Sequence, residues 1–214
     1  MKTLDSILVN KLIAICRGVR KEDIPNLCEA LIRGGIRLIE VTFDHGSEEG
    51  MNETLHSIRE IRDHFAGRLL VGAGTVLSAE EVKAAAEAGA KYIISPNVNA
   101  EVIRMAKVLG LVSVPGAMTP TEVQAAAGLG EDLVKLFPAD VLGLEYYKAI
   151  IAPLKHIRFV PTGGITTENM ADYLRLGAAG FGIGSNLINA KQVKEGRFDL
   201  VEASARAFCQ AAGQ

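Results

Sequence analysis

The chain has 214 residues, of which 49% are hydrophobic and 22% are charged, so its length and apolar content are those of a folded globular protein. Its formal charge of −2 includes no excess of basic residues for binding nucleic acid, and the absence of tryptophan disfavours a base-stacking surface. No apolar run reaches the roughly 18 residues of a membrane-spanning helix, which excludes that class of protein.

The first residues and the cysteines suggest where the protein works. Residues 1–5 lack the apolar core of a signal peptide. Cys16, Cys28 and Cys209 are an odd number without C-x-x-C spacing, which indicates neither a disulfide framework nor a zinc site. We therefore expect a cytoplasmic protein without a bound metal.

Hydrophobic periodicity predicts a short amphipathic helix over residues 3–10, followed by eight cycles of strand and helix. The helices are rich in alanine and leucine, and most end at a glycine shortly before the next apolar run begins. Ser78 and Thr119 are each followed three residues later by glutamate, a pattern typical of a helix-capping box. The predicted strands are residues 12–17, 36–43, 69–75, 91–95, 111–115, 133–137, 157–162 and 180–184.

This alternation predicts an α/β fold. Strands that are apolar on both faces belong to parallel sheets covered by helices. An open, doubly wound sheet is the competing architecture, but residues 72–74 and 180–182 lack the third glycine of a dinucleotide-binding fingerprint. The eight-fold count favours one (β/α)₈ barrel domain over residues 1–214, with the short helix at its N-terminus.

A lysine lies in the middle of the sixth predicted strand. Burying an ammonium group is costly unless the group is paired or neutral, so the simplest alternative is an edge strand with Lys135 reaching solvent. Alternate residues of a barrel strand point inward, and active sites form at the carboxyl ends of the strands. Four strands then place polar side chains on one shared interior, in the sets Leu133, Lys135 and Phe137; Leu38, Glu40 and Thr42; Ile13, Ile15 and Arg17; and Val71, Ala73 and Thr75.

These residue types indicate carbonyl chemistry. Apolar surroundings and the nearby Arg17 lower the pKa of Lys135, and a neutral amine can form a Schiff base with a ketone. Glu40 can then move protons, through a water molecule, while the Thr75 hydroxyl holds a small carboxylate. The structural alternative is a buried Lys135–Glu40 ion pair, which is seldom favourable as a stabilising device.

Two glycine-rich segments follow the last two predicted strands. Residues 161–165 and 182–185 place glycines just before helix starts, which is a usual position for a phosphate group in a barrel. The alternative is that these glycines only form tight turns.

The sequence resembles the family of 2-keto-3-deoxy-6-phosphogluconate (KDPG) and 4-hydroxy-2-oxoglutarate (KHG) aldolases. Members of this family are class I lyases that release pyruvate and an aldehyde. The matching stretches extend in order over nearly the whole chain. They are residues 13–18, 34–42, 72–76, 94–96, 115–122, 135–139 and 161–165.

The resemblance implies a role for each matching residue. Lys135 is the expected Schiff-base lysine and Glu40 the expected general acid and base. The pyruvyl group is expected to contact Arg17, Thr75 and Pro96, and Phe137 is expected to pack beside the imine. The phosphate is expected to contact Gly163, Gly164, Gly184 and Ser185. The family's usual assembly is a homotrimer, with no metal and no cofactor.

Two departures from the family concern the aldehyde half of the substrate. Many members have an arginine where this chain has Asp44 followed by His45, and many have glycine where it has Asn97. An inward Asp44 would disfavour a phosphorylated or dicarboxylate substrate, whereas an outward one would have no effect.

The resemblance leaves several functions open besides the KDPG and KHG reactions. One alternative is an aldolase for an unphosphorylated or galactonate-type 2-keto-4-hydroxy acid. Another is a non-catalytic barrel that binds a phosphorylated metabolite. A third is a barrel enzyme that isomerises or synthesises a phosphorylated ring compound.

Overall fold

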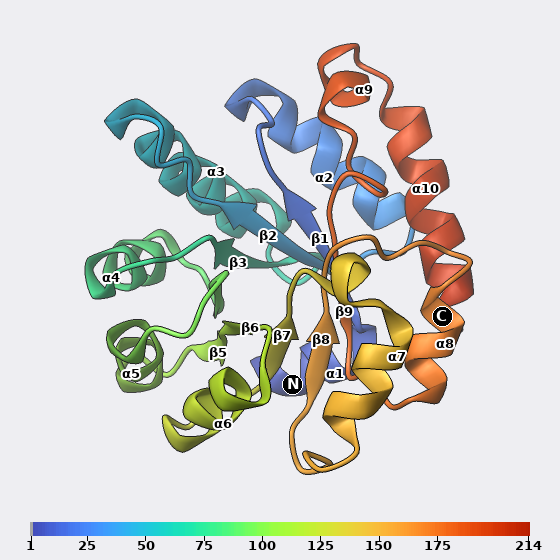
Figure 1. The fold of residues 1–214 in the computed structure, drawn as a ribbon. Coiled ribbons are helices and arrows are strands. Elements are labelled where there is room, and N and C mark those ends of the chain that lie inside the picture. Colours follow the sequence, from blue (N-terminus) through green and yellow to red (C-terminus); the bar gives the residue numbers. More distant parts are fainter. Residues whose placement is uncertain (1) are drawn as a thin grey trace.

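The computed structural model describes residues 2–214, in which helices and strands alternate along the chain (Figure 1). The helices are α1 (Thr3–Asn10), α2 (Ile24–Arg33), α3 (Glu48–Phe65), α4 (Ala79–Ala88), α5 (Ala100–Val108), α6 (Pro120–Gly128), α7 (Ala139–Ile151), α8 (Met170–Arg175), α9 (Ala190–Lys194) and α10 (Phe198–Ala211). The strands are β1 (Leu12–Cys16), β2 (Leu38–Thr42), β3 (Leu70–Gly74), β4 (Tyr92–Ile94), β5 (Val112–Val114), β6 (Gly116–Ala117), β7 (Val134–Leu136), β8 (Phe159–Pro161) and β9 (Phe181–Ile183).

Each predicted strand is present, but the count of elements differs in two places. The fifth predicted strand, residues 111–115, corresponds to β5, and an additional short strand, β6, follows Pro115, which has no N–H group to donate to a neighbouring strand. A short additional helix, α9, lies between the last strand and α10. The α/β alternation predicted from the sequence is therefore confirmed, with one strand and one helix added.

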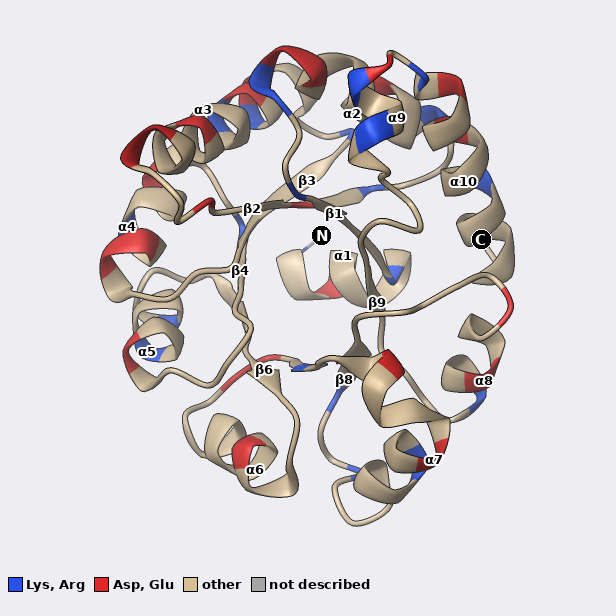
Figure 2. Ribbon diagram, turned by 45° about the horizontal axis from the view of Figure 1, so that its top comes forward, with Lys and Arg blue, Asp and Glu red and all other residues tan. Residues whose placement is uncertain are grey.

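The strands form a curled parallel sheet of six strands, in the order β5-β4-β3-β2-β1-β9, and a second parallel sheet of three, in the order β6-β7-β8. Backbone hydrogen bonds connect the two sheets where β5 meets β7, since the N–H groups of Leu133 and Lys135 donate to the carbonyls of Ser113 and Pro115. At the other edge, Thr162 forms a parallel bridge with Gly182. Helices α2 to α10 lie outside the strands, whereas α1 is seen within the ring that the strands form, as Figure 2 shows.

A small apolar cluster lies on the inner side of both sheets. It contains Ile13 from β1, Leu38 from β2 and Val160 from β8, together with Tyr92 from β4. Ile7 of α1 belongs to the same cluster and is completely buried. Helix α1 therefore covers the end of this interior at which the strands begin.

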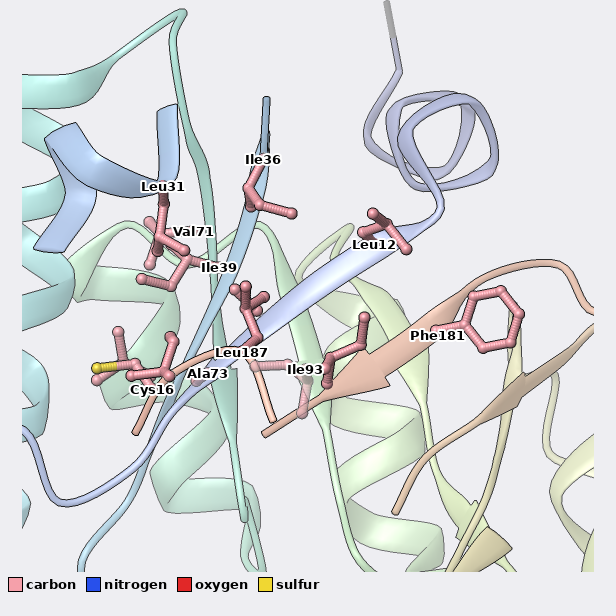
Figure 3. Packing of buried hydrophobic residues seen from close by; sticks show 14 of the residues in the cluster. Leu12, Cys16, Leu31, Ile36, Ile39, Val71, Ala73, Ile93, Phe181 and Leu187 are labelled. Carbon is pink, nitrogen blue, oxygen red and sulfur yellow. The ribbon is translucent and has the colours of Figure 1, made fainter. Parts of the chain in front are cut away.

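The larger apolar cluster lies between the strands and the outer helices. Figure 3 shows Val71 of β3 near Leu31 of α2, and Ala73 of the same strand also belongs to this cluster. The prediction that Val71 and Ala73 share the inner face with Thr75 is therefore wrong. Gly72 and Gly74 face inward instead, because a Cβ atom at these positions would meet Tyr92 and Glu40.

Two predicted helix caps differ in detail. Thr119 and Glu122 form the complete, reciprocal capping box at the start of α6. Ser78 accepts a hydrogen bond from the Glu81 N–H, but the Glu81 carboxylate accepts from the Leu77 N–H, one residue before the cap. Within residues 2–214, no helix combines the length and hydrophobicity needed to cross a bilayer.

Candidate active site

Lys135 lies on β7, the central strand of the three-stranded sheet, with β6 and β8 on either side. Its side chain is buried, with 6% of the residue exposed. The alternative of a solvent-facing edge lysine is therefore wrong. The Nζ atom lies 4.6 Å from the centre of the Phe137 ring, and burial lowers the pKa of Lys135 below its ordinary value.

Glu40 lies on β2 and is also buried, with 1% of the residue exposed. It points inward across β3, where Gly74 has no side chain. A Cβ atom at Gly74 would lie 1.8 Å from Glu40 Oε1, so the carboxyl group fills the space that a larger residue would occupy. The Oε2 atom is buried and has no hydrogen-bond partner among the described residues.

Burial acts in opposite directions on these two groups. It raises the pKa of Glu40, against the attraction of Lys135 and Arg17. It lowers the pKa of Lys135, against the attraction of Glu40, and Arg17 lowers that pKa further. The two side chains form no ion pair within 4.0 Å in residues 2–214. Burial therefore disfavours the charged forms of both groups.

Arg17 and Thr75 meet at the carboxyl ends of β1 and β3. Arg17 Nη2 donates a hydrogen bond to Thr75 Oγ1 over 3.3 Å. Thr75 has a φ angle of +55°, in the left-handed region that β-branched residues rarely adopt. Because the strand alternation ends at this residue, Thr75 reaches Arg17 although Val71 and Ala73 face outward.

A cavity of about 340 Å³ opens beside Lys135. Seven of the ten predicted site residues line it, namely Arg17, Lys135, Phe137, Gly163, Gly164, Gly184 and Ser185. Glu40, Thr75 and Pro96 do not line it. Thr162 and Asn186 line the cavity but were not predicted. The alternation of β8 offered a signal for Thr162, which follows the inward-facing Val160 by two residues.

The two glycine-rich segments form turns at one side of this cavity. Gly163 and Gly164 have φ angles of +98° and +63°, which favour glycine at both positions. The Asn169 side chain donates to the Gly164 carbonyl over 2.9 Å and fixes the turn. The prediction that the glycines directly precede helix starts is wrong, because α8 begins at Met170 and α9 at Ala190.

The residues that depart from the family pattern lie away from the cavity. Asp44 Oδ1 accepts a hydrogen bond from the Gly46 N–H, and Asp44 lines a separate cavity of about 210 Å³ with Arg20 and Thr54. The Asp44 side chain therefore does not line the Lys135 cavity. His45 Nε2 lies 3.1 Å from Glu81 Oε1.

Pro96 and Asn97 follow β4. Pro96 is half-buried and Asn97 is exposed. The Pro96 carbonyl would lie 2.5 Å from a Cβ atom at Gly116, so this backbone packs closely against β6. Within residues 2–214, no group of three or more His, Cys, Asp or Glu side chains is placed to hold a metal ion.

Comparison with known proteins identifies the matching family. The sequence model of the family described as KDPG and KHG aldolase matches residues 4–204. The chain is 36% identical over 201 residues to 2-dehydro-3-deoxy-6-phosphogalactonate aldolase of Escherichia coli strain K12, covering 94% of this chain and 95% of that protein. It is 38% identical over 201 residues to 2-dehydro-3-deoxy-phosphogluconate aldolase of Treponema pallidum, covering 91% and 90%.

A solved structure matches the fold over nearly the full length of both chains. The crystal structure of the KDPG aldolase of Legionella pneumophila superimposes with a TM-score of 0.86 at 27% identity, covering 97% of this chain and 98% of that one. In that crystal, pyruvate was captured at low pH as a covalent carbinolamine intermediate.

Proposed function

Because the chain belongs to the KDPG and KHG aldolase family, we propose that it is a Schiff-base-forming aldolase that uses Lys135 as its nucleophile. It cleaves a 2-keto-3-deoxy-6-phospho sugar acid or 4-hydroxy-2-oxoglutarate to pyruvate and an aldehyde. The observation that carries this proposal is the buried amine of Lys135 at the wall of a cavity, with its pKa lowered by burial.

The first stage of the reaction uses the neutral amine. Lys135 Nζ attacks the C2 ketone of the substrate and forms a carbinolamine, which loses water to give an iminium ion. The Phe137 ring, 4.6 Å from Nζ, stabilises this cation through its π face. Glu40 donates the proton that the departing hydroxide needs, and burial, which raises its pKa, favours the protonated form that can do so.

The second stage breaks the C3–C4 bond. The deprotonated Glu40 takes the proton of the C4 hydroxyl group through a water molecule, and the bonding electrons move into the iminium ion as an aldehyde leaves. The resulting enamine takes a proton at C3 and is hydrolysed, which releases pyruvate and restores the Lys135 amine. The mechanism needs no metal because the iminium ion is the electron sink.

The ends of the substrate require two anion-binding regions. Arg17 and Thr75, with Pro96, hold the pyruvyl carboxylate at the ends of β1, β3 and β4, where the Arg17–Thr75 hydrogen bond brings two donors together. The phosphate is received by Gly163, Gly164, Gly184 and Ser185, which line the cavity. Backbone N–H groups of the turns supply these contacts, without a helix N-terminus.

Two types of sugar acid, the galactonate and the gluconate compound, are the candidate substrates. The relatives described above include an aldolase for the galactonate compound and one for the gluconate compound, at 36% and 38% identity. Asp44 does not line the cavity and so does not oppose a phosphorylated substrate. We propose a six-carbon, 6-phosphorylated 2-keto-3-deoxy acid as the preferred class.

Borohydride trapping tests the nucleophile. Reduction of the protein with pyruvate should add the mass of the reduced pyruvyl group to Lys135, as identified by peptide mass spectrometry. Lactate, which has no ketone, is the control ligand and should give no adduct, and Lys135→Met should give none with pyruvate. An unmodified Lys135, or an adduct on another lysine, would exclude the proposed mechanism.

A substrate panel tests the acid itself. The gluconate and galactonate forms of the phosphorylated acid, their unphosphorylated counterparts and 4-hydroxy-2-oxoglutarate are each coupled to pyruvate detection. We expect the highest kcat/KM for a phosphorylated sugar acid. A higher value for an unphosphorylated acid would contradict the phosphate role of the glycine turns, while leaving the Lys135 chemistry intact.

We also propose that the two sheets form one closed (β/α)₈ barrel in a single domain. The support is the set of backbone bonds at both seams, from Lys135 to Pro115 and between Thr162 and Gly182. A crystal structure tests the closure, and two independently movable sheets would contradict it.

The assembly that we propose is a homotrimer, in keeping with the family's usual state. Light scattering should give three times the 22.8 kDa mass of the chain. A cytoplasmic location is consistent with three free cysteines.

A further inference from the structure

A second polar cavity lies at the end of the fold opposite the candidate active site. Its volume is about 500 Å³. Arg33, Arg37 and Arg206 all line it, so we call it the arginine cavity. Arg33 ends α2, Arg37 directly precedes β2 and Arg206 lies on α10. The proposed reaction uses none of these residues.

Close packing between α2 and α10 brings the three arginines together. A Cβ atom at Gly34 would lie 2.3 Å from Ala205 Cβ, and one at Gly35 would lie 2.9 Å from Cys209 Sγ. The two glycines therefore let the end of α2 rest directly against α10. Gly35 also has a φ angle of +102°, which turns the chain toward Arg37 and β2.

Each guanidinium group contacts the protein through one nitrogen. Arg33 Nε donates to Glu202 Oε2 over 2.7 Å. Arg37 Nη1 donates to the carbonyls of Ile32 and Ile36, over 3.0 and 2.8 Å. Arg206 Nη2 donates to Glu202 Oε1 over 3.0 Å and to the Arg33 carbonyl. These contacts orient the three groups and leave two nitrogens of each one for another acceptor.

The arginine cavity has an excess of positive charge. Glu202 is the one carboxylate that pairs with these arginines in the described part of the chain, and it is shared by Arg33 and Arg206. Within residues 2–214, Arg37 has backbone carbonyls as its partners and no carboxylate. The C-termini of α2 and α10 contribute about half a negative charge each, which offsets part of the excess but not all of it.

Cys209 lies at the wall of the same cavity, near the positive charges of Arg37 and Arg206. Burial raises the pKa of its thiol, and the charges of Arg37 and Arg206 act in the opposite direction. Both guanidinium groups are therefore close to one wall of a single cavity. The three arginines therefore line one cavity rather than three separate parts of the surface.

We propose that the arginine cavity binds a small multivalent anion, of the polyphosphate or tricarboxylate class, through the free nitrogens of Arg33, Arg37 and Arg206. The ligand needs at least two anionic groups, because three separate guanidinium groups must be contacted. Its attraction to them must also exceed its repulsion by the negative C-terminal ends of the two helices. Arginine forks match the planar geometry of carboxylate and phosphate oxygens equally, so the two chemical sources are distinguished by experiment.

Calorimetric titration with pyrophosphate and with citrate, at ionic strength held constant with sodium chloride, tests the proposal. Wild-type protein should bind at least one of them saturably, and the better ligand identifies the class. In the double variant Arg37→Gln/Arg206→Gln, we expect the dissociation constant to rise by at least about tenfold, because two charge-assisted contacts are lost. The control Arg197→Gln removes the same type of charge at the other end of α10, where Arg197 pairs with Asp199, and should bind as wild type does.

Two further measurements separate this site from the active site and from a folding defect. Ser185→Asp adds a negative charge beside the glycine turns and should leave binding at the arginine cavity unchanged. The ligand-induced rise in Tm, measured for each variant against its own unliganded midpoint, removes any change in intrinsic stability. Equal affinity in wild type and the double variant, loss of binding in Ser185→Asp alone, or no saturable binding by wild type would each overturn the proposal.

Discussion

Lys135 and Glu40 are two residues whose charged forms are each disfavoured by the same burial. In the proposed mechanism the amine acts as a nucleophile because it loses its proton more readily, and the carboxyl group acts as an acid because it retains its proton. Arg17 adds a third charge that opposes a proton on Lys135. The protonation of Lys135 therefore depends on two neighbours of opposite sign, and each can be removed separately.

The pH dependence of imine formation should reveal these two influences. Arg17 lowers the pKa of Lys135, so Arg17→Met should raise it and move the acidic limb of the trapping rate to higher pH. Glu40 raises that pKa when it is ionised, so Glu40→Gln should move the limb to lower pH. Rates of borohydride trapping with pyruvate, measured across pH for both variants, provide the check. Shifts in the same direction would contradict the assignment.

Gly74 should be essential because it provides space for Glu40. In Gly74→Ala the new methyl group overlaps the carboxyl group, which must leave its position. We expect kcat to fall by about a hundredfold or more, as when proton transfer is lost, and stability to fall by about 1–3 kcal/mol. The control Gly128→Ala, where no atom lies within 4 Å of the new Cβ, should retain both. Steady-state kinetics and urea unfolding measure the two effects.

At the scale of elements, helix α1 covers one end of the interior, and strand β3 makes room for buried side chains toward the other end. Ile7 of α1 packs against side chains from both sheets where the strands begin. At the other end, β3 contributes two glycines rather than side chains, which leaves room for Tyr92 and Glu40. The Tyr92 hydroxyl donates to the Ile39 carbonyl over 2.6 Å, so the residue that fills the space at Gly72 also binds the backbone next to Glu40.

Truncation of Ile7 should measure how much α1 contributes. Ile7→Ala removes a fully buried side chain and should cost about 2–5 kcal/mol of unfolding free energy. Val9→Ala, on the same helix but 61% exposed, should cost less than about 0.5 kcal/mol. Chemical denaturation of both variants gives the comparison. Equal losses would show that α1 does not seal the interior.

The limits of sequence-based prediction are clearest in β3 and β8. Alternation correctly placed Lys135 and Glu40 on the inner face, because β7 and β2 are regular and apolar between their polar positions. It failed for Val71 and Ala73, which were placed on the inner face only because they alternate with Thr75. Thr75 reaches the open end of the strands through a left-handed backbone, and no residue pattern predicts that conformation for a threonine. It also overlooked Thr162, although Val160 two residues earlier is apolar and inward-facing. The helix starts after Gly164 and Gly184 were misplaced because turns intervene.

For the whole molecule, parallel strands gather the candidate catalytic groups at one end and leave the other end to α1 and the arginine cavity. The six-stranded and three-stranded sheets meet at two seams, one at Pro115 and one between Thr162 and Gly182. The second seam is closely packed, because a Cβ atom at Gly182 would lie 2.6 Å from Thr162 Oγ1.

A single methyl group at this seam should therefore destabilise the whole fold. We expect Gly182→Ala to lower the free energy of unfolding by about 1–3 kcal/mol through overpacking. Gly184→Ala, two residues along and with no atom within 4 Å of the new Cβ, should unfold as wild type does. Thermal unfolding of Gly182→Ala and Gly184→Ala is the measurement. Equal unfolding midpoints for the two variants would mean that a methyl group at position 182 does not destabilise the seam.

The contact between Glu40 and Gly74 also constrains how the gene can change. A larger residue at position 74 is harmful while glutamate occupies position 40, yet it becomes tolerable once that side chain is shortened. The tolerance of position 74 thus depends on the residue at position 40. Because the proposed reaction needs the Glu40 carboxyl group, shortening that side chain would itself remove activity, so selection that keeps glutamate at position 40 also keeps glycine at position 74.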